Sequence, residues 1–269
     1  MIAQRPDAFK LLTGQLSTRD YPSGISPPGQ GGKFDTSGNV QHWQGNTFVC
    51  HVVRSSPCYA AIVELQERVK RSEFAQLMTF MPAPSFHMTV FQGVSPGSQG
   101  SGNWPAGLPD DIHRDDWPAG LSKDIHRDDW PAGLSKDTHR DDATAEMLRR
   151  VHDVELASRF DIRATGLFCA NSLTVAGRND EAESKLRQAR ESLRTATRIS
   201  PPEFDSFVFH ITLGYLIQWL SENTAKELIE FSDSLYAMFK SQLQNIALEP
   251  CAFCNFDNMH AFLPVRVFK

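Results

Sequence analysis

The sequence lacks an excess of positive charge. Its 27 lysines and arginines stand against 32 aspartates and glutamates, which gives a net charge of −5 and a pI near 6.0. A protein that follows a long phosphate backbone needs a broad basic surface, because much of its affinity comes from neutralising many phosphates. We therefore expect no long nucleic acid as a partner, and only a short nucleic-acid ligand if there is one.

A long apolar run and a disulfide pattern are also missing. No stretch approaches the roughly 20 apolar residues that span a bilayer, and the first residues have no charged segment followed by an apolar one, as a secretion signal would. Five cysteines in 269 residues do not make a disulfide scaffold. We expect a cytoplasmic, monomeric protein with no membrane partner.

Two short motifs lack the residues that would complete them. Cys251 and Cys254 have zinc-knuckle spacing, but the chain offers no second cysteine pair for a four-ligand site, so we interpret them as buried reduced thiols. The glycines of 29–33 invite a phosphate-loop interpretation. Phe34 stands where that loop needs Ser or Thr, however, and no helix pattern follows, so these glycines are expected in turns.

The apolar material that is present is enough for one sizeable domain. Hydrophobic residues make up 41% of the chain, while residues 1–45 are rich in Gly, Pro, Ser and Asp. We predict an extended leader at 1–45 and a single bilobal domain at 46–268.

An internal repeat occupies residues 104–142. The segment 104–116, which begins Trp-Pro-Ala-Gly-Leu, recurs with small changes at 117–129 and 130–142. Each unit is short and rich in charge, Pro and Gly, so it can bury little of itself, and we interpret the repeat as copies of one surface loop. A metal site is the alternative, with the ligands His113, His126 and His139.

Elsewhere the pattern predicts alternating strands and helices. Ser56 and Pro57 can cap and begin a helix whose apolar face carries Ile62, Leu65 and Val69. Strands are predicted at 47–53, 74–81, 86–94, 160–176 with a break at 171–172, 204–217 and 246–268, and further helices after the caps Asp142, Asn179 and Ser221. This order predicts an α+β fold of two half-domains of similar design.

Each half contains one strand with a His-x-Thr motif. The first is Phe86-His87-Met88-Thr89-Val90 and the second is Phe209-His210-Ile211-Thr212-Leu213. Because alternate side chains of a strand point to opposite faces, each His-Thr pair shares a face that its apolar neighbours avoid. We expect the four polar side chains to converge if the two halves meet along this face.

Such a quartet suits the cleavage of a phosphate ester. Hydrolysis requires one group to take a proton from water and another to give one to the leaving oxygen, and His87 and His210 can do both near neutral pH. The hydroxyls of Thr89 and Thr212 can donate to the non-bridging phosphate oxygens. This chemistry needs no metal and no cofactor.

The paired motifs resemble those of the 2H phosphoesterase superfamily, which includes 2′,3′-cyclic nucleotide phosphodiesterases and proteins once called 2′-5′ RNA ligases. Segments 32–35 (Gly-Lys-Phe-Asp), 45–47 (Gly-Asn-Thr) and 104–108 are similar to an uncharacterised bacterial and fungal branch. The resemblance covers most of 30–268. It implies two pseudo-symmetric lobes of antiparallel sheet, flanked by helices, around a central groove. It also implies that His87 is the general acid and His210 the general base.

Two aromatic residues are candidates for base stacking. Phe91 should share a strand face with His87 and Thr89. Tyr215 is an odd number of residues from His210, so only a bulge would bring it to the same face.

Other candidates are weaker. Trp43 and Trp219 could also stack on a base. His51 is expected to be buried structure, and Lys33 and Arg178 are expected in solvent, although either could meet a phosphate.

The sequence thus predicts a metal-independent phosphodiesterase for a small cyclic phosphodiester or the 2′,3′-cyclic phosphate end of a nucleotide or short RNA. One alternative is a non-catalytic module that binds a nucleotide or phosphorylated metabolite. Another is an interaction protein that displays the Trp-Pro-Ala-Gly-Leu repeats.

Overall fold

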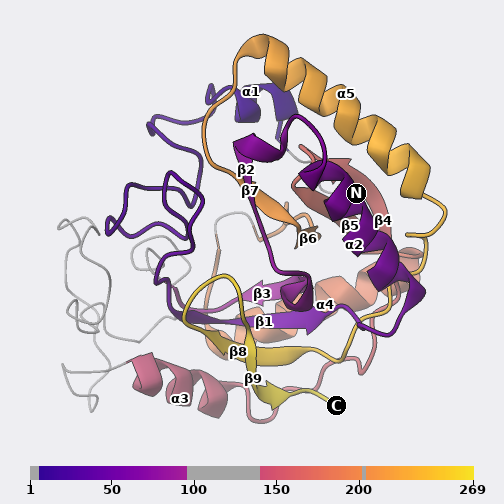
Figure 1. Ribbon diagram of the computed structural model, residues 1–269. Coiled ribbons are helices and arrows are strands. Elements are labelled where there is room, and N and C mark those ends of the chain that lie inside the picture. The colour runs from indigo at the N-terminus through magenta and orange to yellow at the C-terminus, as the bar shows by residue number, and fades with distance from the viewer. Residues whose placement is uncertain (1–5, 96–139, 202–203) are drawn as a thin grey trace.

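The computed structural model describes residues 6–95, 140–201 and 204–269 (Figure 1). The helices are α1 (Ala8–Leu12), α2 (Pro57–Lys70), α3 (Arg140–Arg150), α4 (Asp180–Thr197) and α5 (Glu222–Phe239). The strands are β1 (Gly45–His51), β2 (Met78–Phe80), β3 (His87–Gln92), β4 (Ile162–Phe168), β5 (Ser172–Gly177), β6 (His210–Thr212), β7 (Gly214–Leu216), β8 (Ala252–Phe256) and β9 (Leu263–Val267). None of the helices in these ranges has the length and apolar content that a membrane crossing requires.

Seven strands form one antiparallel sheet in the order β4-β5-β6-β3-β1-β8-β9, and β2 pairs with β7 in a separate ribbon. The predicted mixture of helices and antiparallel sheet is confirmed. β3 from the first half and β6 from the second are neighbours, with Met88 opposite Ile211. The two halves therefore join edge to edge at the two strands that carry the His-x-Thr motifs.

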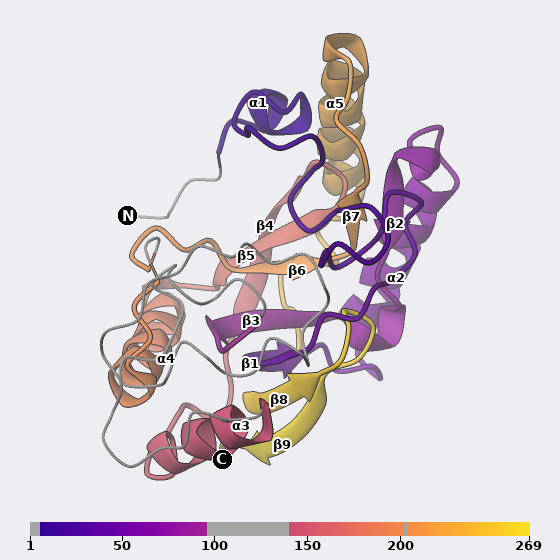
Figure 2. The ribbon, with the colours of Figure 1, turned by 90° about the vertical axis from the view of Figure 1, so that its left-hand side faces the viewer.

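Helices pack against both faces of this sheet. α4 contacts β3 and β5, whereas α5 contacts β4 and α2. In Figures 1 and 2, α4 lies on one side of the sheet and α2 and α5 on the other. The apolar side chains of β3 and β6, among them Met88 and Ile211, are fully buried, which leaves the alternate positions for polar residues.

Several helix boundaries follow the predicted caps. The side chains of Ser56, Asn179 and Ser221 each accept a hydrogen bond from a backbone N–H in the first turn of α2, α4 and α5. The prediction that Asp142 caps α3 is wrong, because the helix begins at Arg140 and Asp142 lies within it.

Two long predicted strands are interrupted in the structure. Segment 74–81 contains a 3-10 turn at Ala75–Leu77 before β2. Segment 204–217 contains only β6 and β7, which belong to different sheets. The N–H groups of Leu213 and Gly214 both donate to the Asn171 carbonyl, at 2.7 and 3.1 Å, so the chain turns out of the main sheet here. A Cβ on Gly214 would lie 2.6 Å from the Thr79 carbonyl oxygen, so this crossing needs glycine.

The described part of the predicted leader is not extended throughout. It contains α1, and it buries Leu12, Ile25 and Phe34 in the main core. Isolated bridges join Phe34 to Ile25 and Val40. Residues 6–44 pack on the domain because these apolar side chains lose contact with water when they do so. The domain boundaries at 45 and 46 stay a prediction. The repeat lies outside the described residues up to position 139, so the loop and metal interpretations of it stay predictions as well.

Candidate functional site

The pairing of β3 with β6 places the two His-x-Thr motifs side by side. With Met88 opposite Ile211 in an antiparallel pair, His87 lies across from Thr212 and Thr89 lies across from His210. All four side chains are half-buried, in contrast to the buried residues between them. We call the face that carries these four side chains the histidine face. Diagonal neighbours on such a face are about 7–8 Å apart, which is a distance that one phosphate group can bridge.

Both histidines are held by the same backbone contact. Nδ1 of His87 lies 2.7 Å from the Ser85 carbonyl oxygen, and Nδ1 of His210 lies 2.9 Å from the Val208 carbonyl oxygen. A carbonyl oxygen can only accept a hydrogen bond, so each Nδ1 must be the donor. In the neutral ring Nε2 then carries the lone pair, and the two imidazoles have the same tautomer and the same orienting contact.

Burial dominates the electrostatics of His87. It lowers the pKa of His87 from 6.5 to about 3, with smaller contributions in the same direction from His51, His210 and Lys33, while the hydrogen bond to the Ser85 carbonyl acts to raise it. The Phe262 ring contributes to this burial, with its centroid 4.1 Å from that of the imidazole. His87 is therefore neutral at pH 7 in the unliganded protein.

A third histidine, His51, lies beside the motif. β1 pairs with β3 so that His51 is opposite His87, and their ring centroids are 6.0 Å apart. Burial lowers the pKa of His51, helped by Arg54 and opposed by Glu249. His51 is half-buried next to the histidine face, whereas its sequence pattern predicts a buried structural residue. Only the register of β1 against β3, a non-local pairing, could have shown this.

Lys33 and Tyr215 also lie near the histidine face. Lys33 is half-buried, and its Nζ donates to Tyr215 Oη at 3.5 Å and lies 5.3 Å from the centroid of that ring. The expectation that Lys33 sits in solvent is therefore wrong. The prediction for Tyr215 assumed that one regular strand runs from His210 to Tyr215. This assumption is wrong, because the chain leaves the main sheet at Leu213 and β7 pairs with β2.

The expectation for Phe91 is wrong. Between Phe48 and Val49 of β1 the register with β3 shifts, so that Phe48 pairs with Phe91 but Val49 pairs with Thr89. This β-bulge turns Phe91 away from the face of Thr89. The Phe91 ring is completely buried, so it cannot stack on a base.

The remaining candidates lie elsewhere or are structural. Trp219 Nε1 donates to the Arg19 carbonyl at 3.0 Å, which ties it to the N-terminal segment. Trp43 is partly buried against the core, and Arg178 is exposed. All five cysteines are buried free thiols, as predicted for Cys251 and Cys254, and burial raises the pKa of Cys254 to about 12.

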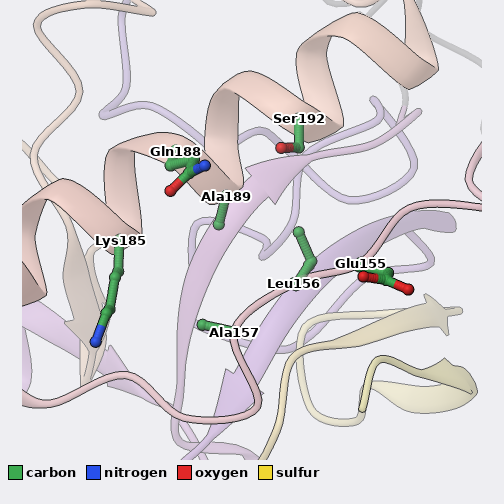
Figure 3. Close-up of a pocket in the computed structure, with 7 residues that line it drawn as sticks. All are labelled: Glu155, Leu156, Ala157, Lys185, Gln188, Ala189 and Ser192. Atoms are coloured by element: carbon green, nitrogen blue, oxygen red, sulfur yellow. The ribbon is translucent and has the colours of Figure 1, made fainter.

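A pocket is present on the α4 side of the sheet. It has a volume of about 140 Å³ and lies between α4 and residues 155–157, with Lys185 and Glu155 in its lining (Figure 3). It contains none of the histidine-face residues. In the part of the chain that the structure describes, no three His, Cys, Asp or Glu side chains are grouped so as to hold a metal ion.

The fold and the site together define an α+β protein with paired His-x-Thr strands at the centre of an antiparallel sheet. Residues 33–125 match the family model 2H-phosphodiest, described as a domain of unknown function. This match covers less than half of the chain; over residues 33–125 the chain is similar to the 2H phosphodiesterase family, and at that level the similarity supports phosphodiesterase-type activity.

The fold is also similar to a solved structure, that of a conserved protein of unknown function from Agrobacterium tumefaciens. The TM-score is 0.78 at 24% sequence identity, and the similarity covers 98% of this chain and 100% of that one. This similarity extends the agreement in fold to nearly the whole chain. No curated protein matches the sequence.

Proposed function

We propose that the protein hydrolyses a small cyclic phosphodiester, such as a 2′,3′-cyclic nucleotide or the cyclic phosphate end of a short RNA, on the histidine face. The observation that carries the proposal is the pairing of β3 with β6, with Met88 opposite Ile211. This pairing sets each histidine across from the threonine of the other motif. One phosphate placed between the strands can then reach both imidazoles and both hydroxyls.

The reaction follows from these four groups. One imidazole removes a proton from water as its oxygen attacks phosphorus, and the other protonates the ring oxygen as the P–O bond to it breaks. The diester and water become a phosphate monoester with a free hydroxyl, and the two protonation states are reset by solvent. Thr89 and Thr212 donate to the non-bridging oxygens, where charge increases in the transition state.

The environment of His87 favours one assignment of the two roles. Its pKa is lowered to about 3, mainly by burial, so the ring is a proton acceptor before substrate binds. We therefore assign His87 as the general base and His210 as the general acid. This is the reverse of the assignment that the family resemblance implies.

The first test is turnover of 2′,3′-cyclic AMP, CMP, GMP and UMP, with and without EDTA. We expect hydrolysis to a monoester that EDTA does not abolish. His87→Ala and His210→Ala should each lower kcat by about 10²–10⁴-fold, as expected when one proton-transfer group is lost. His152→Ala is a suitable control. His152 is exposed, lies far in the sequence from both His87 and His210, and contacts Asp153.

Two outcomes would count against the proposal. Full activity in both single variants would show that the imidazoles do not transfer protons. Tight binding of a cyclic nucleotide by the wild type without product release would favour the alternative, a non-catalytic binding module.

A further inference from the structure

Lys33 has an unusual environment for a lysine. Its side chain is half-buried, yet none of the ion pairs between described residues involves it. A lysine that gives up part of its hydration usually gains an acidic partner in return. The partner of Lys33 is instead a phenol, Tyr215 Oη at 3.5 Å.

The backbone of Lys33 is well held, so its side chain starts from a defined position. Its N–H donates to the Gly24 carbonyl at 2.7 Å, and its carbonyl accepts from the Gln41 N–H at 2.9 Å. The next residue, Phe34, is completely buried and packs on the Tyr215 ring with 5.0 Å between centroids.

The same contacts continue to the histidine face. The Phe34 ring lies 5.9 Å from that of His260, in the turn that also provides Phe262, the ring packed against His87. Lys33 is close enough to His87 for its charge to lower the pKa of the imidazole. Tyr215 follows Thr212 after only two intervening residues. Lys33 is therefore near His87, and its partner Tyr215 lies in the strand that directly follows the second motif.

The charge balance explains what this cation is for. Of the four side chains on the histidine face, His87 is neutral at pH 7, the threonine hydroxyls carry no charge, and His210, as the proposed general acid, loses its positive charge when it protonates the leaving oxygen. The substrate and its monoester product are both anions, and holding them away from water is unfavourable unless a positive charge persists throughout the reaction. Lys33 is the cation whose position fits that requirement.

We propose that Lys33, held by Tyr215, binds a negatively charged phosphate oxygen of the substrate, and that the N-terminal segment 6–44 thereby forms part of the active site. This inference rests on the proposed function and names the feature that the site selects, which is the charge of the ester. Neutral esters should be poor ligands.

Steady-state kinetics with 2′,3′-cyclic AMP tests this role. Lys33→Met should raise KM by about tenfold or more, as expected for the loss of a charge-assisted hydrogen bond, with kcat changed by less than about threefold. Lys33→Arg should restore most of the affinity because it restores the charge. Added NaCl should raise KM of the wild type more than KM of Lys33→Met, since screening acts on a charge that the variant lacks.

Lys226→Met is the matched control. Lys226 also lies over an aromatic ring, with Nζ 5.6 Å from the centroid of Phe9, but it is an exposed residue of α5. This variant should have the KM and the salt dependence of the wild type. A smaller rise in KM is expected for Tyr215→Phe, which keeps the ring and removes the acceptor.

A binding measurement separates failure of this inference from failure of the proposed function. Calorimetry with 2′-AMP and 3′-AMP needs no turnover, and Lys33→Met should bind them at least about tenfold more weakly. If no cyclic nucleotide is hydrolysed but this loss of affinity is seen, the reaction is wrong and the anion site stands. Equal KM and equal affinity in wild type and Lys33→Met would overturn the anion site, and so would the absence of any binding to the wild type.

A second substrate locates the phosphate that Lys33 contacts. A 2′,3′-cyclic nucleotide with an additional 5′-phosphate offers two candidates. If the effect of Lys33→Met is the same with and without the 5′-phosphate, Lys33 binds the reacting group. A larger effect with the 5′-phosphate assigns Lys33 to that remote group, and the charge selection holds in both cases.

Discussion

His87 is kept neutral by its surroundings, and this has a consequence for stability. Below pH 6.5 the unfolded chain binds a proton at this side chain, whereas the folded protein does not bind it until about pH 3. The unfolded state therefore holds more protons in this window, and the folded state loses stability as the pH falls through it.

We expect urea denaturation to show this loss between pH 7 and pH 4.5, and a smaller loss in His87→Asn. Burial lowers the pKa of His51 too, so His51 also makes the folded state less stable as the pH falls. The variant should therefore keep part of the pH dependence of stability. An equal loss of stability in wild type and variant would contradict the neutral state of His87 in the folded protein.

The assignment of base and acid can also be tested at the residue scale. A 4-nitrophenolate leaving group needs little protonation, so an enzyme without its general acid still cleaves such an ester, whereas an enzyme without its general base does not. With a nucleoside 4-nitrophenyl phosphodiester we expect His210→Ala to recover activity to within about tenfold of the wild type, and His87→Ala to stay impaired. Recovery in His87→Ala alone would restore the assignment that the family resemblance implies.

At the scale of elements, α4 holds both motifs through one buried cation, Arg190. Its Nη1 donates to the Val90 carbonyl at 2.7 Å, at the bulge that follows Thr89. Its guanidinium lies 3.9 Å from the centroid of Phe207 and 4.9 Å from that of Phe204, in the segment that leads to β6. Arg190 is almost fully buried, and burial lowers its pKa to about 9.

Arg190→Met should have two opposing effects on the free energy of unfolding. Losing the contact to Val90 leaves a buried carbonyl without its donor, which costs about 1–3 kcal/mol. Removing a buried charge that forms no ion pair with a carboxylate among the described residues is favourable by a similar amount. We expect the free energy of unfolding to change by less than about 2 kcal/mol. Because the two strands lose their common anchor, kcat should fall by about tenfold or more.

Arg194→Met provides the comparison for this variant. Arg194 also belongs to α4 and lies 4.2 Å from the centroid of Phe204, but it is paired with Glu191 at the surface. It should leave both kcat and stability close to wild type. The fall in kcat of Arg190→Met can be converted to a rise in activation free energy. If the free energy of unfolding falls by as much as that, Arg190 has a general structural role and does not specifically position the motifs.

At the scale of the whole molecule, Gln66 of α2 links the two halves. Its Nε2 donates to the Met81 carbonyl in the first half and to the Leu213 carbonyl in the second, each at 2.8 Å. Leu213 directly follows Thr212, and its carbonyl also accepts from the Met81 N–H at 2.9 Å. Gln66 therefore supports the position where the second motif ends.

Gln66→Leu should lower the free energy of unfolding by about 2 kcal/mol, because two buried carbonyls lose a donor. It should also lower kcat, since the end of β6 is less well placed. The control is Gln188→Leu, at an exposed position on α4. Chemical denaturation and kinetics of both variants check this, and wild-type stability in Gln66→Leu would contradict the role of the bridge.

Much of the architecture could be predicted from local signals. The caps Ser56, Asn179 and Ser221 are found at the starts of α2, α4 and α5, since a cap depends only on residues within one helical turn. The alternation of burial also agrees with the prediction in β6 and in β3 from His87 to Val90, and it ends at the bulge before Phe91. Local pattern failed at 204–217, where contacts with Asn171 and Met81 end one strand and begin another in a different sheet.

By itself the sequence determined which side chains of each motif share a face, because the two-residue period of a strand depends on neighbouring residues alone. Only the tertiary structure decided that the two motifs pair in adjacent strands, that the bulge buries Phe91, and that Lys33 is near enough to His87 for its charge to lower the pKa of the imidazole. Each of these depends on contacts between residues far apart in the chain. Such contacts are selected by the packing of the whole core, which no local pattern encodes.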